Sequence, residues 1–454
     1  MKIDLLCAEI GSTTTVVNAF DDLDGKKPVF LGQGVAATTV EDGDVTIGLR
    51  RAEEELRLRL EADALEVADV LATSSAAGGL TMTVHGLVPD MTVRAAREAA
   101  LGSGAVIRAV TAGKLRPSDI ERCRAVKPRI VMVSGGVDHG ERTTALFNFE
   151  ALAKALPDVP ILYAGNIDNH DDIRRLADRF GTPLYVTENV YPTLDELNVA
   201  PAREVIQSVF ESHIVEAPGM AHIRDMVTGA IMPTPGAVMA MAEHLYDELG
   251  DLLVLDVGGA TTDVHSVTWG SERFRPLMTS PEPFSKRSVE GDLGVFLNRS
   301  QVIETMTYQE RVALSSTYEK DLMCIPDVPR NEEETQLILP LVYACAREAL
   351  NRHTGRIVEH YTPRGRIHTV RGRDLSAVET VLATGGALTR LPTAMAMLRR
   401  LIDEAPSEKL YPTSSAGVMI DHNYIMASCG VMTRAYPEAA MQLMRASLSS
   451  RLLD

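Results

Sequence analysis

The feature that most constrains this chain is an internal repeat at a constant offset of 247 residues. Residues 5–17 align without a gap with residues 252–264. Each copy has an apolar strand with an acid near its end, a further apolar residue, a glycine and a small residue, then threonines and a second strand. This pattern predicts a β-hairpin whose tip is rich in glycine and threonine. Two such hairpins in register predict two related lobes that face one ligand.

Each hairpin tip is chemically suited to phosphate. Glycine lets the backbone approach a bulky anion, and backbone N–H groups and threonine hydroxyls supply donors. An acid at the end of the first strand can hold Mg²⁺ directly or through water, and the two acids here are Glu9 and Asp256. We expect these acids to hold the metal and the tip residues to line the phosphates: Gly11, Ser12, Thr13, Thr14, Gly258, Gly259, Ala260 and Thr261.

A third motif lies nearer the C-terminal end. An apolar strand over residues 378–384 runs into Gly385, Gly386 and Ala387, and a helix is expected over residues 391–401. A turn of this kind, between a strand and a helix, lets a flat base pack on exposed backbone. It follows the two hairpins in the chain, which makes it more specific than it would be alone.

Length, charge and cysteine content exclude several classes of protein. At 454 residues the chain is too long for one comfortable core, so two or three domains are expected. A net charge of −17 disfavours a nucleic-acid binder. The five cysteines are scattered, which argues against a disulfide framework, a zinc ribbon or an iron–sulfur cluster and fits a reducing cytoplasm. No apolar stretch approaches about 18 residues, so no membrane partner is expected.

Between the hairpins, residues 84–212 have the rhythm of an inserted α/β domain. Strand candidates alternate with helices of ordinary length, which predicts a parallel, doubly wound sheet, and these strands lie at residues 106–110, 130–134, 161–164 and 184–186. The expected domains are a first lobe over 1–83, the insertion over 84–212, and a second lobe over 213–454 whose C-terminal helices pack back.

Three helical segments are expected in the second lobe. Residues 236–249 form a helix of small residues suited to a close crossing. A long amphipathic helix over residues 331–356 is capped by Asn331, and Pro340 should kink or break it. Residues 423–448 are helical, and their methionines are expected to be core packing.

In this order the three motifs resemble the phosphate-1, phosphate-2 and adenosine motifs of the superfamily of actin, sugar kinases and DnaK-type chaperones. The resemblance spans nearly the whole chain, from Glu9 to Gly386. It implies an α/β fold with two ribonuclease H-like lobes, each a mixed five-stranded sheet, and an α/β insertion domain. It also implies ATP and Mg²⁺ in the cleft between the lobes, with Gly385, Gly386 and Ala387 beside the adenosine.

Two positions depart from that superfamily. Glu9 stands where most members have aspartate, so the longer side chain can make the metal contact indirect. Met232 stands where DnaK-type chaperones have the glutamate that positions the attacking water. Glu290 and Asp292, in a Glu-Gly-Asp-Leu-Gly turn, are candidate catalytic replacements, and the alternative is that they only cap a helix.

Fuller strings resemble the glutamate mutase-associated MutL family (GlmL), which is distinct from the mismatch-repair protein of the same short name. These strings are residues 8–20, 30–34, 43–48 and 72–80. The resemblance implies an ATP-dependent partner of an adenosylcobalamin-dependent mutase or aminomutase, which promotes exchange of damaged corrinoid. It implies a slow Mg²⁺-dependent ATPase that acts as a reactivating chaperone, with a homodimer left open.

Other functions stay open from the sequence. A hydantoinase-like hydrolase shares the string over residues 256–263, and a small-molecule kinase or an actin-type filament would use the same ATP site. The dehydratase activators of the superfamily bridge a cluster with paired cysteines, which this chain lacks. Direct corrinoid binding is not expected: residues 168–170 (Asp-Asn-His) lack the glycine of the Asp-x-His-x-x-Gly signature, and residues 138–140 (Asp-His-Gly) have the wrong spacing.

Overall fold

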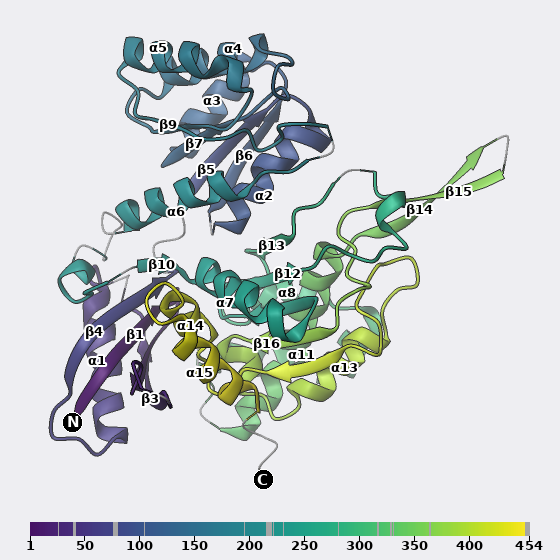
Figure 1. Ribbon diagram of the computed structural model, residues 1–454. Coiled ribbons are helices and arrows are strands. Elements are labelled where there is room, and N and C mark those ends of the chain that lie inside the picture. Colours follow the sequence, from purple (N-terminus) through teal and green to yellow (C-terminus); the bar gives the residue numbers. More distant parts are fainter. Residues whose placement is uncertain are drawn as a thin grey trace. The chain divides into compact units, whose positions relative to one another are not determined.

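The chain forms two compact units (Figure 1). Unit 1 comprises Met1–Ala76, Pro218–Thr279 and Phe284–Asp454, and unit 2 comprises Ala77–Ala217 and Ser280–Pro283. The computed structural model describes residues 1–25, 27–39, 42–75, 80–103, 105–194, 196–214, 220, 222–229, 231–279, 281–315, 317–326, 329, 331–362 and 365–449. Part of the string over residues 72–80, namely 76–79, lies outside the described residues.

The first sheet of unit 1 is mixed and has the strand order β10-β4-β1-β2-β3. Its strands are β1 (Lys2–Ile10), β2 (Thr14–Asp21), β3 (Val29–Ala37), β4 (Glu66–Ser74) and β10 (Ile231–Pro233). β1 pairs antiparallel with β2 and parallel with β4, and β10 continues the parallel side. Helix α1 (Val45–Arg59) packs against this sheet, and the Asp44 side chain caps it by accepting from the N–H of Thr46 at 2.9 Å.

The second sheet repeats this topology. Its order is β13-β12-β11-β16-β17, with the same antiparallel meander of three strands and the same two parallel additions. The strands are β11 (Leu252–Val257), β12 (Thr262–Val267), β13 (Ser285–Glu290), β16 (Thr380–Thr384) and β17 (Gly417–Ile420). The register repeats too, because Glu9 lies opposite Val16 and Asp256 lies opposite Asp263. Both predicted hairpins and the predicted fold class, with two ribonuclease H-like sheets of the actin-like ATPase fold, are confirmed.

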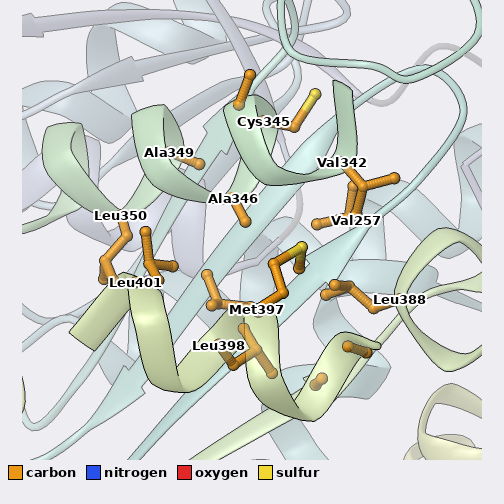
Figure 2. Close-up of a cluster of buried hydrophobic side chains, with 14 of the residues drawn as sticks. Val257, Val342, Cys345, Ala346, Ala349, Leu350, Leu388, Met397, Leu398 and Leu401 are labelled. Atoms are coloured by element: carbon orange, nitrogen blue, oxygen red, sulfur yellow. The ribbon is translucent and has the colours of Figure 1, made fainter. Parts of the chain in front are cut away.

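Alternation along β11 divides its side chains between two cores. Leu253, Leu255 and Val257 face a cluster formed with α11 (Glu332–His353) and α13 (Ala394–Asp403), whose apolar side chains meet as Figure 2 shows. Leu252 and Val254 face the opposite way, into a second cluster. A strand buried on both faces reads as a continuous apolar run, which is how β11 appears in the sequence.

The second cluster joins the two sheets of unit 1. It contains Leu5 and Cys7 from β1, Leu252 and Val254 from β11, and residues of α7 (Thr234–Leu249) and α14 (Met426–Met432). Helices α7 and α14 pack against each other, and α14 also contacts β1 and β4 (Figure 1). The C-terminal helices therefore contribute to the cluster that both sheets share, and the methionines of this segment are core packing as predicted: Met426, Met432 and Met444.

Most expected helices of the second lobe are present, with corrections. Asn331 caps α11 by accepting from the N–H of Glu334 at 2.8 Å. Of the kink or break expected at Pro340, the break is wrong, because α11 runs unbroken from Glu332 to His353. Neighbouring side chains of α11 are buried in the first cluster, which offsets the lost backbone hydrogen bond. The other helices are α8 (Arg299–Thr305), α9 (Tyr308–Ala313), α10 (Tyr318–Met323), α12 (Gly386–Thr389) and α15 (Pro437–Ser449), and β14 (Arg356–Thr362) pairs with β15 (Gly365–Arg371).

Unit 2 contains a parallel sheet with the order β6-β5-β7-β8-β9. The strands are β5 (Thr81–Gly86), β6 (Val106–Ala112), β7 (Ile130–Val133), β8 (Ile161–Tyr163) and β9 (Leu184–Val186). The helices are α2 (Arg94–Gly102), α3 (Pro117–Val126), α4 (Thr143–Ala155), α5 (His170–Phe180) and α6 (Ala200–Ile214). The sequence predicted every strand of this sheet except β5. Threonines alternate with other residues along β5, so it lacks the apolar run from which the other strands were predicted. None of the described helices is long and apolar enough to cross a membrane.

His85 lies buried on β5 and makes unit 2 sensitive to acid. Its Nδ1 and Nε2 atoms lie 2.8 Å and 2.9 Å from the hydroxyls of Thr111 and Thr83. Burial lowers the pKa of His85 to about 4, from an ordinary value near 6.5. Below about pH 6.5 this histidine is protonated in the unfolded chain but stays neutral in the folded protein. The free energy of unfolding therefore decreases as pH falls from about 6.5 towards 4.

We therefore expect His85→Gln to flatten the dependence of stability on pH. Between about pH 7.5 and pH 5.0, this histidine costs the wild type roughly 2 kcal/mol, since each pH unit below about 6.5 is worth about 1.4 kcal/mol. Glutamine can bond both threonines but cannot be protonated. Urea denaturation followed by circular dichroism at both pH values checks this, and equal losses in the two proteins would contradict it.

Candidate functional site

The two hairpin tips have the same backbone turn. In the first, the N–H of Gly11 donates to the carbonyl of Thr14 at 3.0 Å. In the second, the N–H of Gly258 donates to the carbonyl of Thr261 at 2.9 Å. The remaining tip residues are exposed or half-buried, so their backbone and hydroxyl donors are accessible: Ser12, Thr13, Gly259 and Ala260.

The tips also meet each other. A Cβ on Gly259 would lie 2.8 Å from the Thr13 hydroxyl oxygen, so the two hairpins approach closely at this point. Behind the second tip, a Cβ on Gly294 would lie 2.4 Å from the carbonyl oxygen of Ala260. The structure therefore brings together all eight predicted tip residues, four from each hairpin, at one place in unit 1.

Glu9 is buried beneath the two hairpin tips, and its hydrogen bonds with the described residues reach only one of its two carboxylate oxygens. Its Oε1 atom accepts from the Ser428 hydroxyl at 2.6 Å and from the Asn18 side-chain amide at 3.2 Å. Asn18 is in turn fixed by Gln33, whose amide donates to it at 2.8 Å. The other oxygen of Glu9, Oε2, is buried with no hydrogen-bond partner among the described residues. A buried carboxylate oxygen left in this way is suited to a cation or water.

Three carboxyl groups at this site have raised pKa values. Burial raises the pKa of Glu9 to about 8, against the Ser428 hydrogen bond and with the help of the charges of Asp421 and Asp256. Burial and the neighbouring Asp263 raise the pKa of Asp256 to about 7, opposed by Arg287. The pKa of Asp421 is also raised by burial, although four hydrogen bonds oppose this. The site concentrates negative charge that the protein only partly neutralises.

Asp421 was not found from the sequence. It follows β17 directly, and its Oδ2 atom accepts from the Thr384 hydroxyl at 3.0 Å and from the first N–H groups of α14, those of Ile425 at 2.9 Å and Met426 at 2.8 Å. It therefore caps α14 while lying at the carboxyl ends of the parallel strands. An acid directly after a short apolar strand was the available signal.

The third motif lies against the second acid. Gly385 has a left-handed φ of 86°, and a Cβ there would lie 2.4 Å from Oδ1 of Asp256. Gly386 begins α12, and a Cβ on it would meet only Tyr424 Cε1, at 3.9 Å. Ala387 follows, half-buried. Tyr424 has a left-handed φ of 51°, an uncommon conformation for a residue with a side chain, and the sequence did not predict it as a site residue.

An ion pair close to Asp256 influences its pKa. Arg287 on β13 is almost fully buried and donates from Nη2 to Oδ1 of Asp263 at 2.8 Å. Asp263 lies directly across the hairpin from Asp256. The pair is therefore one source of the charge that acts on Asp256, and sequence analysis did not anticipate Arg287.

The two candidate replacements for the missing water-positioning acid are bound to an arginine. Nη1 of Arg352 donates to Oε2 of Glu290 at 2.7 Å and to Oδ1 of Asp292 at 2.8 Å. Glu290 ends β13 beside Thr262 of the second hairpin, so it lies next to the phosphate-type turn. Met232 is buried on β10 beside Thr73 of β4, which leaves no carboxylate at its position.

The donor set fits a Mg²⁺ ion that shares its ligands with a bound anion. Among the described residues, no group of three or more His, Cys, Asp or Glu side chains is placed to hold a metal ion. Mg²⁺ usually takes only one or two carboxylates, several waters and phosphate oxygens, so it does not need such a group. The unpartnered Oε2 atom of Glu9 and the acid of Asp256 supply such a pair.

The repeated sheets and the facing hairpins define a protein of the actin-like ATPase fold. A family model described as MutL protein matches residues 5–448. The chain is 35% identical over 462 residues to Protein MutL of Clostridium tetanomorphum, covering 97% of this chain and 98% of that protein. The chain belongs to the MutL protein family.

Two solved structures are more loosely similar. The diol dehydratase-reactivating factor in its nucleotide-free form is 10% identical, with a TM-score of 0.35, and the match covers 96% of this chain and 100% of that chain. Component A of (R)-2-hydroxyglutaryl-CoA dehydratase from Acidaminococcus fermentans is 10% identical, with a TM-score of 0.31, covering 96% and 99%. At TM-scores this low, neither likeness bears on the fold or the function of the chain.

We expect Gly385→Ala to destabilise unit 1 by about 2–4 kcal/mol, because alanine is strained at a left-handed φ and its Cβ would overlap Asp256. The matched control is Gly386→Ala, which adds the same methyl group one residue later, in open space and at a helix start. Denaturation followed by the fluorescence of Trp269, the single tryptophan of the chain, measures both. Equal stabilities for the two variants would contradict the close contact.

Proposed function

We propose that this protein binds ATP with Mg²⁺ between its two hairpins, hydrolyses it slowly, and uses the nucleotide to reactivate an adenosylcobalamin-dependent mutase or aminomutase. The observation that carries the proposal is the repeated turn. Two hairpins in register, each with an acid near the end of its first strand, present glycine N–H groups and hydroxyls to one place. Phosphoryl chemistry requires this combination of positioned donors and charge neutralisation.

Each part of the nucleotide has a counterpart among the described residues. The two tips supply backbone and hydroxyl donors for phosphate oxygens, as glycine-rich turns do in other anion sites. Gly385 and Gly386 offer bare backbone on which the adenosine can pack, with the ring of Tyr424 beside Gly386. The metal, when bound, supplies positive charge to the phosphates, and Glu9 and Asp256 are the carboxylates that would hold it and its water shell.

The raised pKa values support a cation at this site. Burial makes all three carboxyl groups costly to ionise, and the charges of neighbouring carboxylates add to that cost for Glu9 and Asp256. A divalent cation offsets both effects. Ser428 and Asn18 fix one oxygen of Glu9 and leave the other available. Glu290 and Asp292 are the acids we propose for positioning the attacking water, from their place beside the second hairpin.

Membership in the MutL family supports the choice of partner, because the sequence resembles the MutL family that is associated with glutamate mutase. Corrinoid damaged in turnover stays in the mutase, and reactivation requires that the pocket open and exchange it for intact cofactor. Nucleotide can drive such a change only through different affinities for two states of this protein. We propose that unit 2 is the part that contacts the mutase, since unit 1 contains the nucleotide site.

Ser428→Ala tests the positioning of Glu9. We expect Mg²⁺-dependent ATP hydrolysis to fall about 10- to 100-fold, because the buried carboxylate loses its closest hydrogen bond and its fixed orientation. The control is Thr433→Ala at the end of the same helix, whose hydroxyl, among the described residues, bonds only the carbonyl of Gly430. Phosphate release at several Mg²⁺ concentrations measures the effect, and hydrolysis unchanged in Ser428→Ala would contradict the role of Glu9.

Reactivation is tested on the mutase itself. A mutase that has lost activity during turnover should recover when this protein, MgATP and free adenosylcobalamin are added, and damaged corrinoid should leave the enzyme. Asp256→Asn, which removes a metal-holding charge, should abolish recovery. Recovery that is equal without ATP, or absent with the wild type, would overturn the proposed function.

A further inference from the structure

The sheet of unit 2 has a topological switch point. In chain order its strands are arranged 2-1-3-4-5, so the direction of winding reverses between β5 and β7. In parallel sheets of this kind, ligands bind at the carboxyl ends of the strands beside such a reversal. Three loops lie at the carboxyl ends of β7, which borders the reversal, and of the next strands β8 and β9. Their described residues are 134–142, 164–169, 187–194 and 196–199.

A histidine and a carboxylate from two of these loops form a pair. Nδ1 of His139 lies 3.1 Å from Oδ1 of Asp168. The side chain of His139 is 79% exposed and that of Asp168 is 34% exposed, so the pair lies at the surface of the loops. His139 also has a left-handed φ of 62°, a conformation uncommon for residues with a side chain, although less so for histidine.

Buried amides hold the pair in place. Oδ1 of Asn166 accepts from the N–H of His139 at 3.2 Å and from the N–H of Asp168 at 3.0 Å, so one side chain fixes both residues. Asn166 is fully buried. Arg142 donates to the carbonyl of Asp168 at 2.8 Å and to the amide oxygen of Asn169 at 3.1 Å. Side chains in functional sites are typically held in position by supporting hydrogen bonds of this kind, whereas side chains of ordinary surface ion pairs are not.

Close packing of the loops supports the same geometry. A Cβ on Gly165 would lie 2.9 Å from the backbone nitrogen of Gly135, so the loops after β7 and β8 touch through glycine. Oδ1 of Asp138 accepts from the N–H of Ile167 and from the amide of Asn189, both at 3.0 Å, which joins the loop after β9 to the other two. Three loops therefore act as one rigid support for His139.

The chemistry of this pair is that of a metal ligand. A carboxylate at Nδ1 directs the proton of the ring there and leaves Nε2 as the ligand atom, which is the usual arrangement of metal-bound histidines. A bare zinc ion would need three or four side chains, and no group of three or more His, Cys, Asp or Glu in the described part of the chain could hold a metal ion. A single imidazole is enough for a metal that a macrocycle already holds, with one axial position open.

We propose that Nε2 of His139 is an axial ligand to the cobalt of a corrinoid, with Asp168 as its positioning residue. The choice of corrinoid over other macrocycles rests on the proposed function, since a factor that exchanges damaged corrinoid meets that ligand. The Asp-x-His-x-x-Gly signature requires the carboxylate and the histidine in one short segment. In this protein the histidine, His139, and the carboxylate, Asp168, come from two different loops, so the signature matches neither residues 138–140 nor residues 168–170. His170 is not the ligand, since its Nε2 atom is buried and its ring packs against Tyr163.

The test uses cob(II)inamide, a corrinoid without a nitrogenous base of its own, and electron paramagnetic resonance of the full-length protein. Ligation by one histidine splits each cobalt line into three, and protein labelled with ¹⁵N-histidine should give two. His139→Gly removes the imidazole and tolerates the left-handed φ, so it should abolish the splitting and weaken binding at least tenfold. Asp168→Asn should weaken binding, and His244→Ala, at an exposed histidine of α7, should leave it unchanged.

Several outcomes would overturn this inference. They are no splitting in the wild type, splitting retained in His139→Gly, and binding of haem at His139 without binding of cob(II)inamide. If His139→Gly fails to fold, the splitting of the cobalt lines in the wild-type protein still shows whether a histidine binds the cobalt. The result is also separable from the proposed function. Reactivation without cobinamide binding would refute this site alone, and cobinamide bound through His139 without any reactivation would support the site and refute the proposed function.

Discussion

The site depends on three carboxyl groups brought together where strands end. Glu9, Asp256 and Asp421 come from different parts of the chain, and each raises the pKa of another or has its own raised by burial. Such repulsion costs folding free energy unless a cation binds or a proton is taken up. The surrounding structure tolerates that cost, and this is typical of sites whose charge is completed by a ligand.

Helix α14 makes the arrangement possible. Asp421 caps its first turn and Ser428, the third residue of the helix, reaches Glu9, so one short helix touches the acids of both sheets. The same helix packs on α7 inside the cluster shared by β1 and β11. Glu9 is therefore joined through Ser428 to the closely packed core that both sheets share.

The fold was largely predictable because its signals are local. A strand, a glycine turn and a second strand lie within thirteen residues, and the same pattern recurs at offset 247, so both hairpins could be read from the sequence. Ser428 and Asn18 could not, because each is an ordinary polar residue whose role arises only when separate segments meet, and for Asp421 the only signal was its place directly after the short apolar strand β17. The pair of His139 and Asp168 escaped for the same reason, since it joins two loops. Pro340 does not break α11, because core packing outweighs one lost hydrogen bond.

The central claim is that both hairpins serve one MgATP. A double-mutant cycle of Glu9→Gln and Asp256→Asn, with MgATP affinity measured by calorimetry, tests it most directly. If both acids act on the same metal and its water shell, the double variant should differ from the sum of the single variants by about 1 kcal/mol or more. Effects that add to within about 0.5 kcal/mol would mean that the two acids act independently, and would contradict a shared site.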